Sequence, residues 1–314
     1  MAVKPGYKQT EVGVIPEDWD VKPLPDICRF RSGKAHEKHI SEFGQFVCVN
    51  SKFISTDGGV RRFSNANFSP DKKNDVLMVM SDLPNGRALA KAYLVEQDDL
   101  YAVNQRVCAL TAYSDCPEYL FYALNRNPYF LRFDDGVNQT HLLNRVFQKC
   151  PVMVPRDVTE QRAIATALSD VDALLGALDR LIAKKRDLKQ ASMQQLLTGQ
   201  TRLPGFDGKW VVKLLGDIAR IQRGASPRPI DSPVWFDQNS SVGWVRISDV
   251  TKSGMYLRET TQRLSALGIQ QSRPVARGSL IMSICATVGR PVVTDIDVCI
   301  HDGFVVFDDL QADK

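Results

Sequence analysis

Residues 19–33 read WDVKPLPDICRFRSG, and residues 210–224 read WVVKLLGDIARIQRG, 191 positions further along the chain. Eight of the fifteen positions carry the same residue, and neither stretch contains a gap. The repeated pairs are Trp19/Trp210, Val21/Val212, Lys22/Lys213, Leu24/Leu215, Asp26/Asp217, Ile27/Ile218, Arg29/Arg220 and Gly33/Gly224. An ungapped match of this length indicates that the chain contains two copies of one module.

Short strands dominate the first copy. Residues 46–49 (FVCV), 75–80 (DVLMVM), 92–95 (AYLV) and 106–110 (RVCAL) are β-rich runs that clusters of Asp, Gly, Asn and Pro separate. Residues 118–125 (EYLFYALN) have a helical pattern with its apolar side chains facing inward. The first copy is therefore predicted to be a mixed α/β domain, which extends over residues 1–155.

The second copy follows the same order of elements. Residues 242–250 form a β-rich run, residues 279–284 (SLIMSI) match residues 76–80, and residues 301–307 (HDGFVVF) fall where residues 104–110 stood. At the offset of the opening repeat, Lys314 corresponds to Ala123, inside the predicted helix of the first copy. We therefore expect a second domain over residues 201–314 that is incomplete at its C-terminal end.

A long helix is predicted between the copies, in a central segment over residues 156–200. Thr159 is placed to cap its start, and Gly199 follows its last turn. Its apolar positions alternate steps of four and three residues, the spacing of a coiled-coil seam: Ile164, Leu168, Val171, Leu175, Leu178 and Ile182. The pattern fits a surface helix packed on its neighbours or a helix that pairs with another helix, and its length favours the second. The predicted fold class is α+β, with two similar mixed α/β domains separated by a coiled-coil-type helix.

Bulk composition fits two domains. The chain has 314 residues and 44% hydrophobic content, enough for a buried core in each domain, and its net charge of +4 permits an anionic partner. Seven cysteines without a C-x-x-C pair indicate free thiols in a reducing cytoplasm rather than disulfides or a zinc site. Neither a secretory signal nor a membrane-length apolar run is present in the sequence. We expect a cytoplasmic protein that has no membrane partner.

The amino-acid sequence of the central segment resembles that of a known family. Residues 154–165 (VPRDVTEQRAIA), 168–172 (LSDVD), 184–190 (KKRDLKQ) and 193–206 (MQQLLTGQTRLPGF) are similar to the central conserved region of the specificity subunits of type I restriction-modification systems. The module openings, IPEDW at residues 15–19 and LPGFDGKW at residues 203–210, resemble the target-recognition domains of that family. The resemblance covers nearly the whole chain.

The resemblance implies a non-catalytic DNA reader. Each target-recognition domain would read one half of a split sequence in double-stranded DNA, and the central helix would act as a spacer and as a dock for methyltransferase subunits. The methyltransferase subunits use S-adenosylmethionine, and restriction/translocase subunits that need ATP and Mg complete the complex, so the chain itself is expected to bind no cofactor. The alternative is a truncated or half-type subunit that acts as a dimerisation or interaction protein through the central helix.

Candidate DNA contacts are residues that can donate hydrogen bonds to base edges and phosphates. In the first copy they are Lys52, Arg61, Arg62, Arg87, Lys91, Asn104, Gln105, Arg106, Asn138, Gln139, Thr140, His141 and Arg145. In the second copy they are Arg223, Arg228, Arg246, Lys252, Arg290 and His301. Taken singly, each residue of the second copy is more often an ordinary surface charge, and the cluster at residues 138–145 is the sharpest candidate of the first copy. Residues repeated between the copies are better candidates for fold or phosphate contact than for base reading, and Trp19 and Trp210 are predicted core anchors.

Catalytic and metal motifs are weak in this sequence. Residues 127–129 (NPY) lack the second proline of an adenine-methyltransferase motif, and Lys34 is followed by alanine rather than by the serine or threonine of a P-loop. His36 and His39 have no further ligands near them in sequence, so a metal site is not predicted. Asp75, Lys91 and Glu96 suggest nuclease chemistry only loosely. We therefore expect no catalytic residue and no metal in this chain.

Overall fold

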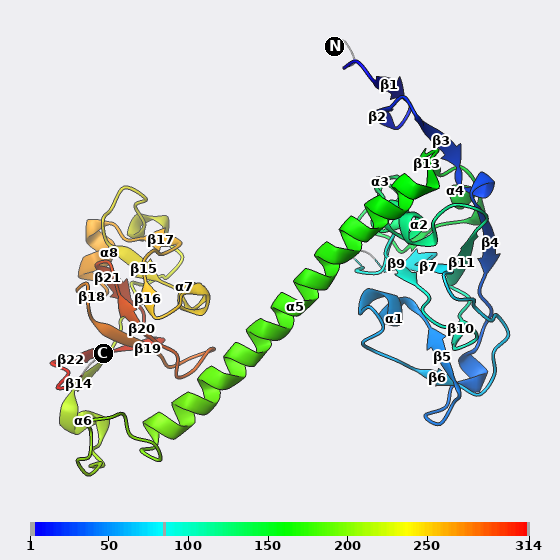
Figure 1. The fold of residues 1–314 in the computed structure, drawn as a ribbon. Helices are drawn as coiled ribbons and strands as arrows, with labels where there is room; N and C mark the ends of the chain where they lie inside the picture. Colours follow the sequence, from blue (N-terminus) through cyan, green and yellow to red (C-terminus); the bar gives the residue numbers. More distant parts are fainter. Residues whose placement is uncertain (1–3, 84–85, 313–314) are drawn as a thin grey trace. The chain divides into compact units, whose positions relative to one another are not determined.

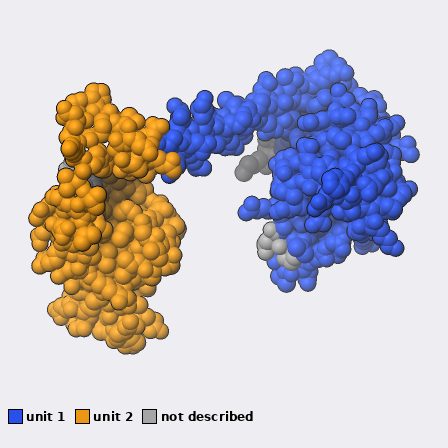
Figure 2. Space-filling view, turned by 90° about the horizontal axis from the view of Figure 1, so that it is seen from below, with its two compact units in different colours: residues 1–192 blue, residues 193–314 orange. Residues whose placement is uncertain are grey.

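The computed structural model describes residues 4–83 and 86–312. The chain divides into two compact units, residues 1–192 (unit 1) and residues 193–314 (unit 2) (Figure 2). The division falls inside helix α5 (Val158–Leu197), so most of this helix belongs to unit 1 (Figure 1). Strands and short helices mix within each unit, and the chain has the predicted α+β class.

Unit 1 matches the predicted elements closely. Its strands are β1 (Tyr7–Thr10), β2 (Gly13–Pro16), β3 (Trp19–Pro23), β4 (Cys28–Ser32), β5 (Phe46–Val49), β6 (Phe63–Ser64), β7 (Val76–Val79), β8 (Ser81–Asp82), β9 (Ala92–Leu94), β10 (Tyr101–Val103), β11 (Val107–Ala112), β12 (Thr140–His141) and β13 (Pro151–Pro155). Its short helices are η1 (Leu24–Asp26), η2 (Glu37–His39), α1 (Ser51–Ser55), α2 (Pro117–Leu124), α3 (Pro128–Leu131) and α4 (Asn144–Gln148). The strands predicted at residues 46–49, 75–80, 92–95 and 106–110 and the helix predicted at 118–125 are confirmed.

Strand β7 separates two apolar cores in unit 1. It lies inside a sheet of order β4-β11-β7-β9, and all four of its residues are buried. Because strand side chains alternate between faces, Val76 and Met78 join one core while Leu77 and Val79 join the other. The second core also contains apolar residues of the sheet β10-β5-β6. An uninterrupted apolar run in the sequence thus marks a strand covered on both faces.

Helix α5 is fixed to unit 1 at its first turns. The carboxylate of Asp157 accepts hydrogen bonds from the backbone N–H of Thr159 at 2.8 Å and from its hydroxyl at 2.6 Å. The prediction that Thr159 caps the helix is therefore wrong, because Thr159 already lies in the first turn and donates to the cap. The buried Gln161 amide donates to Asp115 and to the Pro155 carbonyl. Beyond the last turn Gly199 adopts a φ of +72°, the predicted left-handed terminator.

Unit 2 contains the last residues of α5 and the chain that follows it. Its strands are β14 (Arg220–Arg223), β15 (Gly243–Val245), β16 (Tyr256–Leu257), β17 (Gln262–Arg263), β18 (Arg273–Val275), β19 (Leu280–Ser283), β20 (Pro291–Thr294), β21 (Val298–Ile300) and β22 (Phe304–Asp308). Its helices are α6 (Leu215–Ile218), η3 (Pro233–Trp235), α7 (Ile247–Lys252) and α8 (Ala266–Gln270). The β-rich run predicted at residues 242–250 is strand only to Val245, and α7 begins after it.

The two units share one sheet topology. Unit 2 contains a sheet of order β14-β22-β19-β20-β16, in which the first four strands correspond to β4-β11-β7-β9 of unit 1. The parallel pair β15 and β21 corresponds to the parallel pair β5 and β10. The antiparallel strand beside β15 is β17, as β6 lies beside β5. The sequence repeat is therefore a repeat of the fold.

The first strand of the repeat behaves differently in the two units. Trp19 starts β3, which pairs with β13, and its ring meets Tyr119 edge to face at 6.4 Å. Trp210 is 58% exposed, so its predicted role as a core anchor is wrong. Within the part of unit 2 that the structure describes, no strand pairs with the segment at Trp210, which leaves its side chain without a β3-like site. Lys314, which the opening offset aligned with Ala123, lies outside the described residues.

Candidate nucleic-acid interface

Each unit ends its main sheet in a group of loops that we call its apex. Apex 1 comprises residues 33–39, 80–81 and 104–106, and apex 2 comprises residues 224–228, 284–285 and 301–303. Four backbone hydrogen bonds close each apex. In unit 1 they run from the N–H groups of Gly33, Lys34, Met80 and Val107 to the carbonyls of Val107, Val103, Arg106 and Asn104. In unit 2 they run from the N–H groups of Gly224, Ala225, Ile284 and Phe304 to the carbonyls of Phe304, Ile300, Gly303 and His301.

The repeated glycine makes this closure possible. A Cβ at Gly33 would overlap the carbonyl of Asn104, and a Cβ at Gly224 would overlap the carbonyl of His301. Both neighbours are backbone atoms, which cannot swing away as a side chain would. Close backbone approach therefore explains why glycine recurs at this position of the repeat.

A carboxylate ties the two loops of apex 1 together. Glu37 Oε1 accepts hydrogen bonds from Asn104 Nδ2 at 3.2 Å and from Gln105 Nε2 at 3.1 Å. A hydrogen bond from its own backbone N–H and those from the two amides hold the pKa of Glu37 below its usual range, so the group is ionised at neutral pH. Glu37 and Gln105 are both exposed.

Two further contacts stiffen apex 1. Asn104 Oδ1 accepts from the backbone N–H groups of His36 and Gln105. The buried His36 ring stacks on Phe68 with centroids 5.3 Å apart, and its Nε2 accepts from the Phe68 N–H. Burial lowers the pKa of His36, so this ring is neutral and has a structural role.

Apex 2 makes the same tie with the polarity reversed. Asp302 occupies the position equivalent to Gln105, and its Oδ1 accepts from the hydroxyl of Ser226 at 2.8 Å. Arg228 Nη2 lies 3.7 Å from Asp302 Oδ2, and Arg223 donates to the Asp302 carbonyl at 2.7 Å. The Ser226 hydroxyl, helped by a hydrogen bond from the Asp302 backbone N–H and by the charge of Arg228, holds the pKa of Asp302 below its usual range. We call residues 104–106 and 301–303 the turn of each apex, and residues 33–39 and 224–228 its facing loop. The carboxylate is therefore on the turn in unit 2 and on the facing loop in unit 1.

The predicted contact His301 faces inward rather than outward. Its ring lies 4.8 Å from the Phe304 ring and 5.8 Å from the Trp244 ring, and only 13% of its side chain is exposed. Its Nδ1 accepts from the Gly303 N–H. Burial lowers the pKa of His301, so its place in apex 2 is structural, like that of His36 in apex 1.

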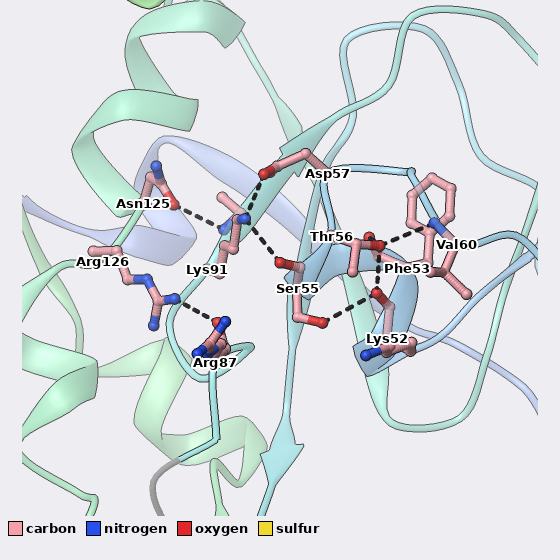
Figure 3. Close-up of polar contacts among 11 residues, drawn as sticks. Lys52, Phe53, Ser55, Thr56, Asp57, Val60, Arg87, Lys91, Asn125 and Arg126 are labelled. Carbon is pink, nitrogen blue, oxygen red and sulfur yellow. Dashed lines mark hydrogen bonds and ion pairs between the residues drawn. The ribbon is translucent and has the colours of Figure 1, made fainter. Parts of the chain in front are cut away.

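The candidates beside α1 in unit 1 are not equally free. Lys91 Nζ lies 2.6 Å from a carboxylate oxygen of Asp57 and donates to the Ser55 carbonyl (Figure 3). Arg87 is exposed, and its carbonyl accepts a hydrogen bond from Arg126. Lys52, Arg61 and Arg62 are exposed, as is Arg106 in apex 1. Lys91 thus fastens a loop, and Arg61 donates from Nε to the Gly58 carbonyl at 3.1 Å, whereas Lys52, Arg62 and Arg106 present their charge to solvent.

The cluster at residues 138–145 lies beside apex 1. Strand β12 pairs with β8, and Gln139 Nε2 donates to the Ser81 hydroxyl at 3.1 Å. Asn138 donates to the Asp135 carboxylate, and Thr140 is buried. His141 and Arg145 are exposed. The structure therefore brings Gln139 and His141 next to apex 1 and turns Thr140 inward.

Three candidates of unit 2 lie away from apex 2 or serve the fold. Arg246 donates to Gln262 at 2.7 Å, and its guanidinium carbon lies 5.9 Å from the Trp244 ring. Arg290 donates to the Ser253 carbonyl at 2.7 Å. Lys252 is exposed at the end of α7. Arg223 and Arg228 are the predicted cations that apex 2 brings together, and both are exposed.

The apolar stripe of α5 divides into two parts. Ile164 packs into a small cluster with Cys116, Tyr119 and Ala165 of unit 1. The remaining predicted seam residues are between 42% and 54% exposed: Leu168, Val171, Leu175, Leu178 and Ile182. The stripe therefore starts as a contact of unit 1 and continues as an exposed apolar face.

The sequence prediction missed the two carboxylates. The predicted DNA contacts are side chains that donate hydrogen bonds to bases and phosphates, whereas Glu37 and Asp302 are acceptors. Their place relative to the repeated glycines was the available signal. Glu37 follows Gly33 by four residues, and Asp302 sits in the turn that closes over Gly224.

A family model described as the type I restriction modification DNA specificity domain matches residues 16–184, more than half of the chain. The chain belongs to the type I DNA specificity family. Curated relatives in this family include the specificity subunits of the type I restriction enzymes MjaVIII and MjaIX of Methanocaldococcus jannaschii. The first is 22% identical over 303 residues, covering 89% of this chain and 69% of the relative. The second is 22% identical over 271 residues, covering 78% of this chain and 61% of the relative.

Solved structures from type I restriction-modification systems share the fold. The S subunit of a type I restriction-modification system from M. genitalium superposes with a TM-score of 0.53 at 15% identity, covering 94% of this chain and 73% of that one. A chain from a study of assembly and conformational transition of the type I R-M system superposes with a TM-score of 0.61 at 18% identity, covering 95% and 77%. Both likenesses concern the fold.

None of the helices in residues 4–83 and 86–312 is long and apolar enough to cross a membrane. The same residues contain no group of three or more His, Cys, Asp or Glu side chains placed to hold a metal ion.

Proposed function

We propose that this chain is a DNA sequence-specificity subunit that reads a bipartite target and itself carries out no catalysis. One observation carries the proposal: the two units build the same apex from the same backbone hydrogen bonds and display different side chains on it. A protein that reads two different half-sites needs this combination, because the scaffold must be repeated while the contacts to bases must differ. Residues 1–155 and 201–314 are the two readers in this proposal.

The charges at the two apexes support double-stranded DNA as the ligand. Exposed cations surround both, including Lys34, Lys38 and Arg106 at apex 1 and Arg223 and Arg228 at apex 2. Such side chains neutralise phosphates and position a duplex, and nearby amides and guanidinium groups read base edges in the major groove. Which of these residues contact DNA stays a prediction.

Residues 156–200 act as a spacer and a dock in this proposal. The exposed leucines of α5 form an apolar face that a second helix would cover. Methyltransferase subunits, which would supply the S-adenosylmethionine chemistry, are the proposed occupants, and ATP- and Mg-dependent restriction subunits would join them. A homodimer through this face is the alternative. Light scattering of the chain with and without a methyltransferase subunit distinguishes the two, because homodimerisation predicts twice the monomer mass for the chain alone.

Co-expression tests the function directly. The chain is produced with the methyltransferase subunit of its system in a host that lacks adenine methylation, and the methylated sequences of the genome are determined. We expect one new motif made of two specific halves separated by a gap of fixed length. Cells that carry either protein alone are the controls and should gain no motif. Unmodified adenines in the co-expressing cells would contradict the proposal.

A further inference from the structure

The two apexes share one arrangement of side chains that the family resemblance does not predict. In apex 1 the carboxylate of the facing loop, Glu37, holds two amides of the turn. In apex 2 the carboxylate of the turn, Asp302, holds Ser226 and Arg228 of the facing loop. We propose that Glu37 and Asp302 are positioning residues, which orient the base-reading side chains of the two half-site readers. This inference rests on the proposed function and deepens it.

Gln105 is the reading side chain of apex 1. Asn104 is used internally, because its Oδ1 accepts two backbone N–H groups and its Nδ2 donates to Glu37. Gln105 donates one Nε2–H to Glu37 at 3.1 Å and keeps a second N–H and its Oε1. One donor and one acceptor on the same amide match the N7 and N6 groups of adenine in the major groove. Glu37 thus selects which N–H remains and which way the amide plane faces.

Arg228 has the corresponding role in apex 2. Its side chain is 72% exposed, and its Nη2 lies 3.7 Å from Asp302 Oδ2. Asp302 is itself oriented by the Ser226 hydroxyl, which donates to its Oδ1 at 2.8 Å. The remaining guanidinium donors are arranged as a fork, which matches the O6 and N7 acceptors of guanine. The base-reading side chain therefore comes from the facing loop in unit 2 (Arg228) and from the turn in unit 1 (Gln105).

The carboxylates also explain how affinity and discrimination are balanced. An unrestrained amide or guanidinium can turn to a phosphate, which raises affinity for any sequence. A negative charge beside the reader disfavours phosphate there and keeps the side chain aimed at base edges. Removing the carboxylate should therefore relax base preference while non-specific binding is kept or increased. Loss of the fold would reduce both.

The test uses the complex of the full chain with its methyltransferase subunit and a pool of random-sequence DNA duplexes. Wild-type complex should enrich a motif of two halves. Glu37→Ala should lower discrimination in one half only by ~5- to 100-fold, the range of one bidentate base contact. Asp302→Ala should do the same in the other half only. Glu37→Gln, which keeps an acceptor oxygen, should recover part of the preference.

Affinity for a duplex without the motif supplies the second measurement. Both alanine variants should bind it at least as tightly as wild type, with a salt dependence no weaker than that of wild type. Glu42→Ala and Asp231→Ala are matched controls, because they remove exposed carboxylates from the β4–β5 and β14–β15 segments. These controls should keep both half-motifs.

Three results would overturn the inference. They are unchanged preference in both alanine variants, relaxation of both halves by one variant, and a fall in affinity for the duplex without the motif. Failure of the wild-type complex to enrich any sequence would instead overturn the proposed function, so the two ideas fail separately.

Discussion

Apex 1 and apex 2 are closed by the same backbone hydrogen bonds and tied by side chains of opposite polarity. Glu37 reaches from the loop after β4 to the turn in unit 1, whereas Asp302 reaches from the turn to the loop after β14 in unit 2. The difference shows that the backbone determines where the two loops meet. Side chains determine only which hydrogen-bond donors, acceptors and charges the apex presents to a ligand.

A second difference lies beneath the apexes. In unit 2, β18 pairs with β21 over three residues, and Val275 stands opposite Val298. In unit 1 the equivalent backbone contact is the single bridge between Pro70 and Ala102, and the buried carboxylate of Asp71 accepts the Tyr101 N–H at 3.0 Å. In unit 1 the Asp71 side chain therefore bonds to the backbone of β10, where in unit 2 the strand β18 bonds to the backbone of β21. Unit 1 carries a buried ionisable group as a result.

Substituting the repeated glycines should have the largest effect. Gly33→Ala would force a Cβ into the Asn104 carbonyl and should destabilise unit 1 by at least about 3 kcal/mol, and Gly224→Ala should do the same to unit 2. Hydrogen exchange along a urea series reports each unit separately. Gly208→Ala is the control, because a Cβ there meets open space. Equal stability of all three variants would show that the closure is not tight.

The repeated tryptophans should differ in effect. Trp19→Ala removes the ring that contacts Tyr119 and donates to Glu160 at 3.2 Å, and it should cost about 2–3 kcal/mol in unit 1. Trp210→Ala should change stability by less than about 0.5 kcal/mol, because the side chain is 58% exposed. Thermal unfolding followed by circular dichroism measures both. Similar losses would mean that Trp210 has a buried site after all.

The buried carboxylate should make unit 1 sensitive to pH. Burial raises the pKa of Asp71 from its ordinary value of 3.8 to about 6. Between these values the folded state binds more protons than the unfolded state, so stability should fall as the pH rises from 4 to 6, by about 2 kcal/mol. Asp71→Asn keeps an acceptor for the Tyr101 N–H and should remove this loss.

Hydrogen exchange of β10, corrected for its intrinsic pH dependence, measures that change. Strand β21 of unit 2 is the internal control, because Val275 replaces the carboxylate there. Equal pH dependence in β10 and β21 would contradict the assignment to Asp71.

Two lysines of unit 1 provide the smallest and most specific contrast. Lys91→Met breaks the ion pair with Asp57 and should cost about 0.5–1 kcal/mol while changing DNA affinity less than about twofold. Lys52→Met should leave stability unchanged and weaken binding, with a salt slope shallower by about 0.9 if Lys52 meets one phosphate. Fluorescence anisotropy with a labelled duplex at several salt concentrations tests this. The reverse pattern would exchange the roles of the two residues.

The sequence predicted the scaffold better than the site, for a physical reason. Apolar runs such as residues 76–79 determine strands through local burial, and the same pattern recurs in unit 2, so the repeated topology was predictable. The ties of Glu37 and Asp302 were not, because each joins residues about 70 positions apart through space. Trp210 shows the limit of the repeat itself. Trp19 is half-buried where β3 pairs with β13, whereas the identical residue Trp210 has no partner strand and stays exposed.

The closure of the apexes also bears on how such a protein changes over evolutionary time. Of the eight hydrogen bonds that close the two apexes, all join backbone atoms, and a backbone bond is indifferent to the side chain beside it. Loops on such a frame can vary in sequence without moving, provided that the two glycines stay. Each unit can therefore acquire a different set of exposed side chains at its apex by point substitution, independently of the other unit, while its own backbone is kept.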